Sequence, residues 1–176
     1  MRISHQSITE NPTVVPEITA LIKALSTLGW DYDVLRPDLI VFAPQSPHGR
    51  RHYNSFFKLE LEPIRISMEM RCELGGMTDR MAEARLAVNI RNKTRASARF
   101  ALHDISGSSA WLIGIFTIDR VLGNEDLFKT FLVDSLWKFG HFSMALELVF
   151  FAEESASHAI ERADAVYEDL RKKIQN

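Results

Sequence analysis

The chain has 176 residues, 46% of them hydrophobic, with 21 lysines and arginines against 23 acidic residues. This length and composition are typical of one globular domain and exclude a disordered or fibrous chain. The formal net charge of -2 excludes a uniformly basic protein, so binding to nucleic acid or to an anionic membrane would require a local patch of cations.

The chain shows no internal repeat and no long linker. Residues 1–12 are polar and are expected to form a flexible N-terminal tail, and residues 13–176 are expected to form a single domain. The stretch richest in loop-forming residues is APQSPHGRRH, residues 43–52.

The first predicted helix covers residues 14–28, because apolar residues recur there at helical spacing. Pro16 suits its first turn, and Gly29 suits its C-terminal end. After it, aromatic and apolar residues alternate with acids over residues 30–34, and residues 39–43 (LIVFA) form a short apolar run. These two stretches predict a first β-hairpin.

Two more strands are predicted over residues 57–61 and 66–72, where apolar and charged residues alternate. A two-residue turn at positions 63 and 64 would join them in a register that matches both faces. That register pairs Glu62 with Arg65, Lys58 with Glu69, Leu61 with Ile66 and Leu59 with Met68.

The second predicted helix, which ends near Asn92, is apolar on two opposite sides. One side carries Met77, Met81, Ala84 and Val88, and the other carries Ala82, Leu86 and Ile90. A helix with two apolar sides needs two partners, of which one is its own sheet. We therefore predict that Ala82, Leu86 and Ile90 contact a second subunit.

The remaining elements are a hairpin and further helices. The strand within WLIGIFTI, residues 111–118, is apolar on both faces and should be central in the sheet. A third helix begins after the N-cap residue Asn124, and Gly140 is expected to kink or interrupt it. A last helix over about residues 154–173 carries an apolar stripe that covers the core or pairs with another chain.

The sequence contains few candidates for chemistry. It has no Gly-rich phosphate loop, and its single cysteine, Cys72, excludes an internal disulfide and a Cys-based zinc site. Cys72 falls at an inward strand position, where it should act as a small core residue. His48 and His52 are four residues apart in the loop that contains Pro47, which argues against a helical metal site. No cofactor or metal is predicted.

The cations between residues 85 and 99 allow two interpretations. Arg91, Lys93, Arg95 and Arg99 could bind phosphates. Alternatively, Arg91 and Lys93 lie in the last turn of a helix, where cations interact favourably with the helix dipole. The segment also lacks interleaved aromatic residues for base stacking, which favours the structural interpretation.

Two segments carry a family resemblance: residues 21–43, LIKALSTLGWDYDVLRPDLIVFA, and residues 80–149, which begin RMAEARLAVNIRNKTRASARF. They resemble the YbjN-like bacterial family in element order, with Asn89 or Asn92 at the position of a helix-ending Asn and Arg99-Phe100 at the start of the next strand. The resemblance implies an α+β fold shared with type III secretion chaperones, in the order α-β-β-β-α-β-β-α with a sheet of about five strands. This chain adds a C-terminal helix, and it is nearly neutral where the chaperones are acidic.

The resemblance also implies a role. Members are described as candidate regulators of signalling or stress responses, and the chaperones usually form dimers in which the middle helix takes part. The chain is thus expected to be a non-catalytic, cytoplasmic, homodimeric protein-interaction module with a polypeptide partner and no membrane contact, since its longest apolar run is shorter than the ~20 residues that span a bilayer.

Two alternatives stay open. One is a small-molecule sensor or enzyme that uses the loop over residues 45–52 together with His103. The other is nucleic-acid binding through the basic segment over residues 91–99.

Overall fold

The computed structural model describes residues 16–43, 56–63, 65–75, 78–94, 98–104, 109–119 and 124–175. In chain order, the elements are α1 (Pro16–Thr27), β1 (Asp31–Arg36), β2 (Leu39–Ala43), β3 (Phe56–Leu61), β4 (Arg65–Gly75), the 3-10 turn η1 (Thr78–Arg80), α2 (Met81–Thr94), β5 (Ala98–Asp104), β6 (Ser109–Asp119), α3 (Glu125–Phe151) and α4 (Ala156–Gln175). The predicted α+β class and the additional C-terminal helix are confirmed. Four strands rather than three precede α2, so the sheet has six strands.

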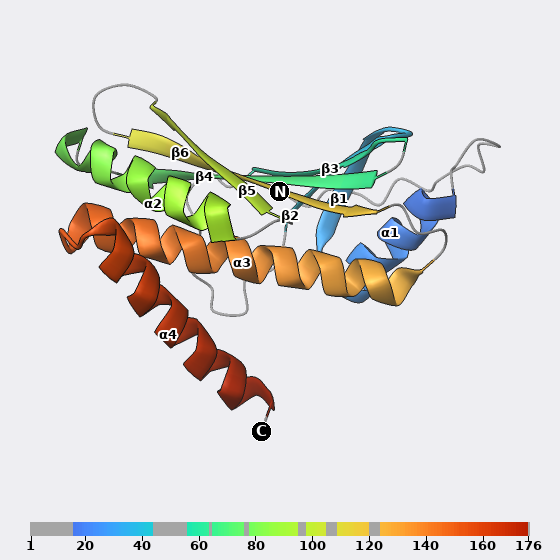
Figure 1. The fold of residues 1–176 in the computed structure, drawn as a ribbon. Helices are drawn as coiled ribbons and strands as arrows, with labels where there is room; N and C mark the ends of the chain where they lie inside the picture. Colours follow the sequence, from blue (N-terminus) through green and yellow to red (C-terminus); the bar gives the residue numbers. More distant parts are fainter. Residues whose placement is uncertain are drawn as a thin grey trace.

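The sheet is antiparallel throughout, in the order β1-β2-β3-β4-β6-β5. Figure 1 shows all four helices on the same side of it. The residues of β4 alternate between the two faces of the sheet. Ile66, Met68 and Met70 are fully buried on the side of the helices, whereas Arg65 and Arg71 are exposed on the opposite face. The sheet therefore has an inner face that holds the core and an open face on which none of the described helices packs.

The predicted register between β3 and β4 is confirmed at every position. Lys58 lies opposite Glu69, Leu59 opposite Met68, and Leu61 opposite Ile66. The Glu62 amide donates to the Arg65 carbonyl at 2.8 Å, which closes the hairpin although Pro63 is not a favoured hairpin-turn residue. The register is thus the one that pairs apolar residues on one face of the hairpin and opposite charges on the other.

Helix α3 runs across the inner face and holds the centre of the core. Its Phe142 packs against Phe100 of β5, with ring centroids 4.5 Å apart, and Phe100 meets Phe116 of β6 edge-on at 5.7 Å. Strand β6 lies between β4 and β5, which confirms that it is central in this half of the sheet.

The expected break at Gly140 is wrong, because α3 is a continuous helix of 27 residues that includes Gly140. Gly140 is on the solvent side, with no atoms within 4 Å of the position that a Cβ would take. The helix keeps its course there because Phe139 and Phe142, on either side of Gly140, are both buried in the core. Its predicted start is confirmed, since the Asn124 side chain accepts a hydrogen bond from the Leu127 amide at 2.9 Å.

The helix instead ends at a sharp turn between α3 and α4. Glu153 adopts a positive φ of 55°, and Arg80 donates to the Glu154 carbonyl at 2.7 Å. Glu83 of α2 accepts the Ala156 amide at 2.6 Å. From this turn α4 packs on α2 and α3 and then projects away from the body of the protein (Figure 1). Over the described ranges, none of the helices has both the length and the apolar character needed to cross a membrane.

Candidate protein-interaction surfaces

A row of apolar side chains lies on the open face of the sheet. Along β6, Leu112 and Phe116 are buried on the inner face, so the alternating residues between and before them face away from the helices. These are Trp111, Ile113 and Ile115, named the open-face row below. Ile115 is 41% exposed, and Trp111 and Ile113 are partly exposed.

Charged residues border the open-face row on β4. Glu69 lies opposite Ile115, and Arg71 lies opposite Ile113. Lys58 Nζ is 2.9 Å from Glu69 Oε2, and Arg71 pairs with the same carboxylate. Burial opposes ionisation of Glu69, but hydrogen bonds and charge from Lys58 and Arg71 outweigh it and lower the pKa of Glu69. The border is thus a set of ion pairs beside an apolar strip, the arrangement of a polar rim around an interface core.

The other border of the row is β5, the edge strand of the sheet. Arg99 lies opposite Ile115, Ala101 opposite Ile113, and His103 opposite Trp111. All three β5 residues are exposed. His103 therefore stands at the margin of an apolar surface, with a single carboxylate neighbour in sequence, Asp104, that is paired with Arg85 at 2.7 Å.

Asn92 ties the end of α2 to this edge strand. Its side-chain oxygen accepts the Phe100 amide at 2.8 Å, and its Nδ2 donates to the Phe100 carbonyl at 2.9 Å. Of the two asparagines suggested by the family resemblance, Asn92 makes this contact and Asn89 is exposed. The side-chain amide of Asn92 therefore occupies the backbone hydrogen-bonding groups of Phe100 that a neighbouring strand would otherwise use. Without it, this edge of β5 could pair with a strand of another chain.

The predicted dimer residues on α2 differ in their surroundings. Leu86 is 47% exposed and Ala82 is exposed, but Ile90 is partly buried and packs against the core. Helix α4 also packs on α2, where Glu83 and Arg91 contact it. The contact of Leu86 with another subunit stays a prediction.

Of the four candidate anion-binding residues, the three that the structure describes do not form one cationic surface. Arg91 has a side chain only 5% exposed, and its Nη2 donates to Asp164 Oδ1 of α4 at 2.9 Å. Lys93 is exposed, and Arg99 donates to the Asn92 carbonyl at 3.2 Å. Arg95 lies outside the described residues. Asp164 is 73 positions from Arg91, so this pairing is invisible to local sequence reasoning.

A polar cluster surrounds the Arg91–Asp164 pair, with Arg91 and His141 buried and the Asp164 side chain 46% exposed. His141 Nε2 is 3.0 Å from the same Asp164 oxygen, and the Arg91 guanidinium carbon is 5.6 Å from the centre of the Phe142 ring. The His141 ring stacks on Tyr167 with centroids 4.8 Å apart. The cluster joins α2, α3 and α4, and its charged groups are directed at one another.

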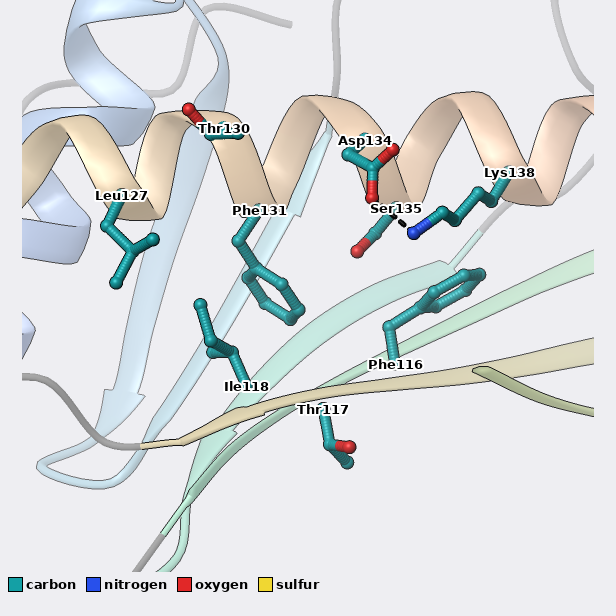
Figure 2. Close-up of a pocket in the computed structure, with 9 residues that line it drawn as sticks. All are labelled: Phe116, Thr117, Ile118, Leu127, Thr130, Phe131, Asp134, Ser135 and Lys138. Atoms are coloured by element: carbon teal, nitrogen blue, oxygen red, sulfur yellow. Dashed lines mark ion pairs between the residues drawn. The ribbon is translucent and has the colours of Figure 1, made fainter. Parts of the chain in front are cut away.

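A small hollow of about 210 Å³ lies between α3 and β6 (Figure 2). Phe116, Ile118, Leu127 and Phe131 provide its apolar walls, and Thr117, Thr130, Asp134, Ser135 and Lys138 complete the lining. Asp134 and Lys138 pair with each other. The hollow is smaller than the roughly 300–1,000 Å³ of typical ligand sites, and its charged groups are already paired.

Cys72 is not placed as a reactive nucleophile. Burial raises the pKa of the Cys72 thiol to about 12, with a further contribution from the Glu147 carboxylate, so the thiolate nucleophile is nearly absent at neutral pH. The loop over residues 45–52, with His48 and His52, lies outside the described residues. Within the described part of the chain, no three His, Cys, Asp or Glu side chains are grouped as metal ligands.

Of the comparisons with known proteins, the one with solved structures supports the fold. No protein-family model matches the chain, and no curated protein matches it. Among solved structures, the crystal structure of YbjN from E. coli, named as a candidate transcription regulator, superposes with a TM-score of 0.54 at 14% sequence identity, covering 77% of this chain and 93% of YbjN. The chain has a YbjN-like fold.

The YbjN-like fold confirms the arrangement implied by the family resemblance. It does not identify a function, because one fold supports many functions and the function depends on the site. In this YbjN-like chain the candidate sites are exposed apolar surfaces: the open-face row, Leu86, and the projecting part of α4.

Proposed function

We propose that this protein is a non-catalytic protein-interaction module that acts as a homodimer and binds a polypeptide partner across the open face of its sheet. The open-face row carries this proposal. The inner face of β6 already supplies core residues, so apolar side chains on its other face are not needed to build the core. A polypeptide partner would bury them, and each fully buried aliphatic side chain contributes about 1.5–3 kcal/mol.

A polypeptide suits this surface better than a nucleic acid does. Of the cations beside the row, Arg71 and, one strand further away, Lys58 are paired with Glu69. Arg99 on β5 donates to the Asn92 carbonyl. A polyanion would therefore meet acidic as well as basic groups beside the row. An apolar centre with a rim of paired charges is instead typical of protein interfaces.

A regulatory role is part of the proposal. YbjN, whose fold this chain shares, is named as a candidate transcription regulator. A protein-interaction module would exert such a role by binding another protein. The buried, unreactive Cys72 supports this interpretation.

The proposal is tested by comparing partner capture by the parent protein and an Ile115→Asp variant. Placing a carboxylate in the row should abolish capture of a partner from the native lysate, because the charge would be desolvated in the interface. The control is Leu35→Asp on β1, whose leucine is 59% exposed and lies on a strand remote from β6 in the sheet order. Equal capture by the parent and by Ile115→Asp would refute the proposed surface.

A further inference from the structure

Helix α4 has one apolar stripe with two different environments. In its N-terminal half, four residues at helical spacing are buried: Ala156, Ala159, Ile160 and Ala163. The stripe continues at the same spacing into Val166 and Leu170, which are 40% and 42% exposed. The sequence pattern therefore runs further along α4 than the body of the protein that covers it.

The divergence of α4 from α3 is fixed by specific contacts. Asp164 is held by Arg91 at 2.9 Å, and Tyr167 stacks on His141. Trp137 of α3 meets Tyr167 edge-on with centroids 6.1 Å apart and remains 37% exposed. Beyond this junction α4 projects from the body (Figure 1). Val166, Leu170 and Trp137 together form the α4 patch.

We propose that a second copy of this chain covers the α4 patch, with the two α4 helices packed antiparallel. This inference rests on the homodimer of the proposed function and assigns its contact to α4 rather than to Leu86 of α2. A two-fold axis presents the same patch on both subunits, so each exposed apolar residue of the patch is buried twice in one dimer.

Charge along α4 selects the antiparallel arrangement. Asp169 and Lys173 lie beside Val166 and Leu170 on α4, whereas Glu168 and Lys172 lie on the opposite side of the helix. Two antiparallel helices that cross near Leu170 place Asp169 of one copy beside Lys173 of the other. Parallel helices would align acids with acids and lysines with lysines, which is unfavourable.

The test is sedimentation equilibrium of the full chain over a range of concentrations. Leu170→Asp should weaken the dimer at least about tenfold, because it replaces a buried leucine with a carboxylate on both sides of the interface. The matched control is Leu86→Asp, since Leu86 is also an exposed helical leucine, at 47%. The control should leave the dimer constant unchanged, and circular dichroism should show that both variants keep the parent's helix content.

A charge exchange tests the orientation separately. Asp169→Lys alone should weaken the dimer, and adding Lys173→Asp should restore it, because antiparallel helices bring these positions together across the two-fold axis. Unchanged dimerisation of Leu170→Asp would overturn the inference, and so would loss of the dimer in Leu86→Asp. If the parent is dimeric, either result would still be consistent with the homodimer of the proposed function. A parent that stays monomeric would overturn both the inference and the homodimer.

Discussion

Gly114 of β6 should not tolerate replacement by a residue with a side chain. It lies on the inner face of the sheet, paired with Met70 of β4 and Phe100 of β5. A Cβ at this position would be 2.6 Å from Cδ2 of Phe139 and 3.0 Å from Cε2 of Phe116. Both neighbours are buried aromatic rings, so neither moves aside without disturbing the contact between α3 and the sheet.

Two effects of opposite sign determine the result of Gly114→Ala. Overpacking a core by one methyl group typically costs about 1–3 kcal/mol. Replacing a strand glycine reduces the entropy of the unfolded chain and returns about 0.5–1 kcal/mol. Because 2.6 Å is too short for any carbon contact, we expect the steric effect to dominate, with a net loss of about 1–2 kcal/mol in the free energy of unfolding.

Urea denaturation followed by circular dichroism measures this difference. The matched control is Gly140→Ala, because Gly140 is in a helix with open space around it, and alanine there should stabilise the protein by up to about 1 kcal/mol. Adding Phe139→Leu to Gly114→Ala should relieve part of the clash, so the double variant should lose less than the sum of the single changes. A Gly114→Ala protein as stable as the parent would refute the argument.

Three further results are expected. Asn92→Ala should lower the free energy of unfolding by about 1–3 kcal/mol, measured by the same denaturation, because the amide and carbonyl of Phe100 each lose a partner; an unchanged midpoint would contradict this. Cys72, with a pKa of about 12, should react with a thiol reagent at pH 8 only as fast as the protein opens, and rapid labelling of the native protein would show that the thiol is accessible. Since folding lowers the pKa of Glu69 from its ordinary value of 4.5, its ionised form contributes stability above that pH, and the contribution is lost as pH falls through the folded value. Lys58→Met should make this acid-induced loss of stability smaller, as followed by thermal unfolding between pH 6 and pH 3, and an unchanged pH dependence would exclude the ion pair as its source.

Sequence alone predicted the features that repeat over short distances. The β3–β4 register followed from alternation on two faces, because a shift by one residue would have moved Leu59 and Met68 to the open face. The start of α3 followed from Asn124 and the acids after it, which act within a single turn. The α+β class followed from a family resemblance that the YbjN-like fold confirms, although four strands rather than the implied three precede α2.

The C-terminal half of α3 was not predicted correctly from local sequence preferences. Glycine favours helix termination, so Gly140 was assigned a break. The helix ends instead at Phe151, two residues before Glu153 with its positive φ, where Arg80 of another element binds the carbonyls of Val149 and Glu154. A contact between residues about seventy positions apart thus outweighed the local preference of a single residue.

The ion pair of Arg91 was likewise outside the reach of local sequence patterns. Arg91 was a candidate for anion binding because its local sequence is cationic, but its partner Asp164 belongs to α4. Only one of the two candidate interaction surfaces could be predicted from the sequence. The two apolar faces of β6 were visible as an unbroken apolar run, whereas the exposure of Leu170 depends on the angle at which α4 leaves α3.

The two proposed surfaces lie on different parts of the molecule, and this has a functional consequence. The open-face row is on the side of the sheet that carries no helix, and α4 projects from the opposite side (Figure 1). Pairing through α4 would therefore leave both open faces of a dimer accessible. Two binding faces on one particle raise the apparent affinity for a partner that is itself dimeric or repeated, because the second contact forms at a high effective concentration. Loss of the α4 contact should then weaken partner capture without any change in the open-face row, which separates the role of dimerisation from that of binding.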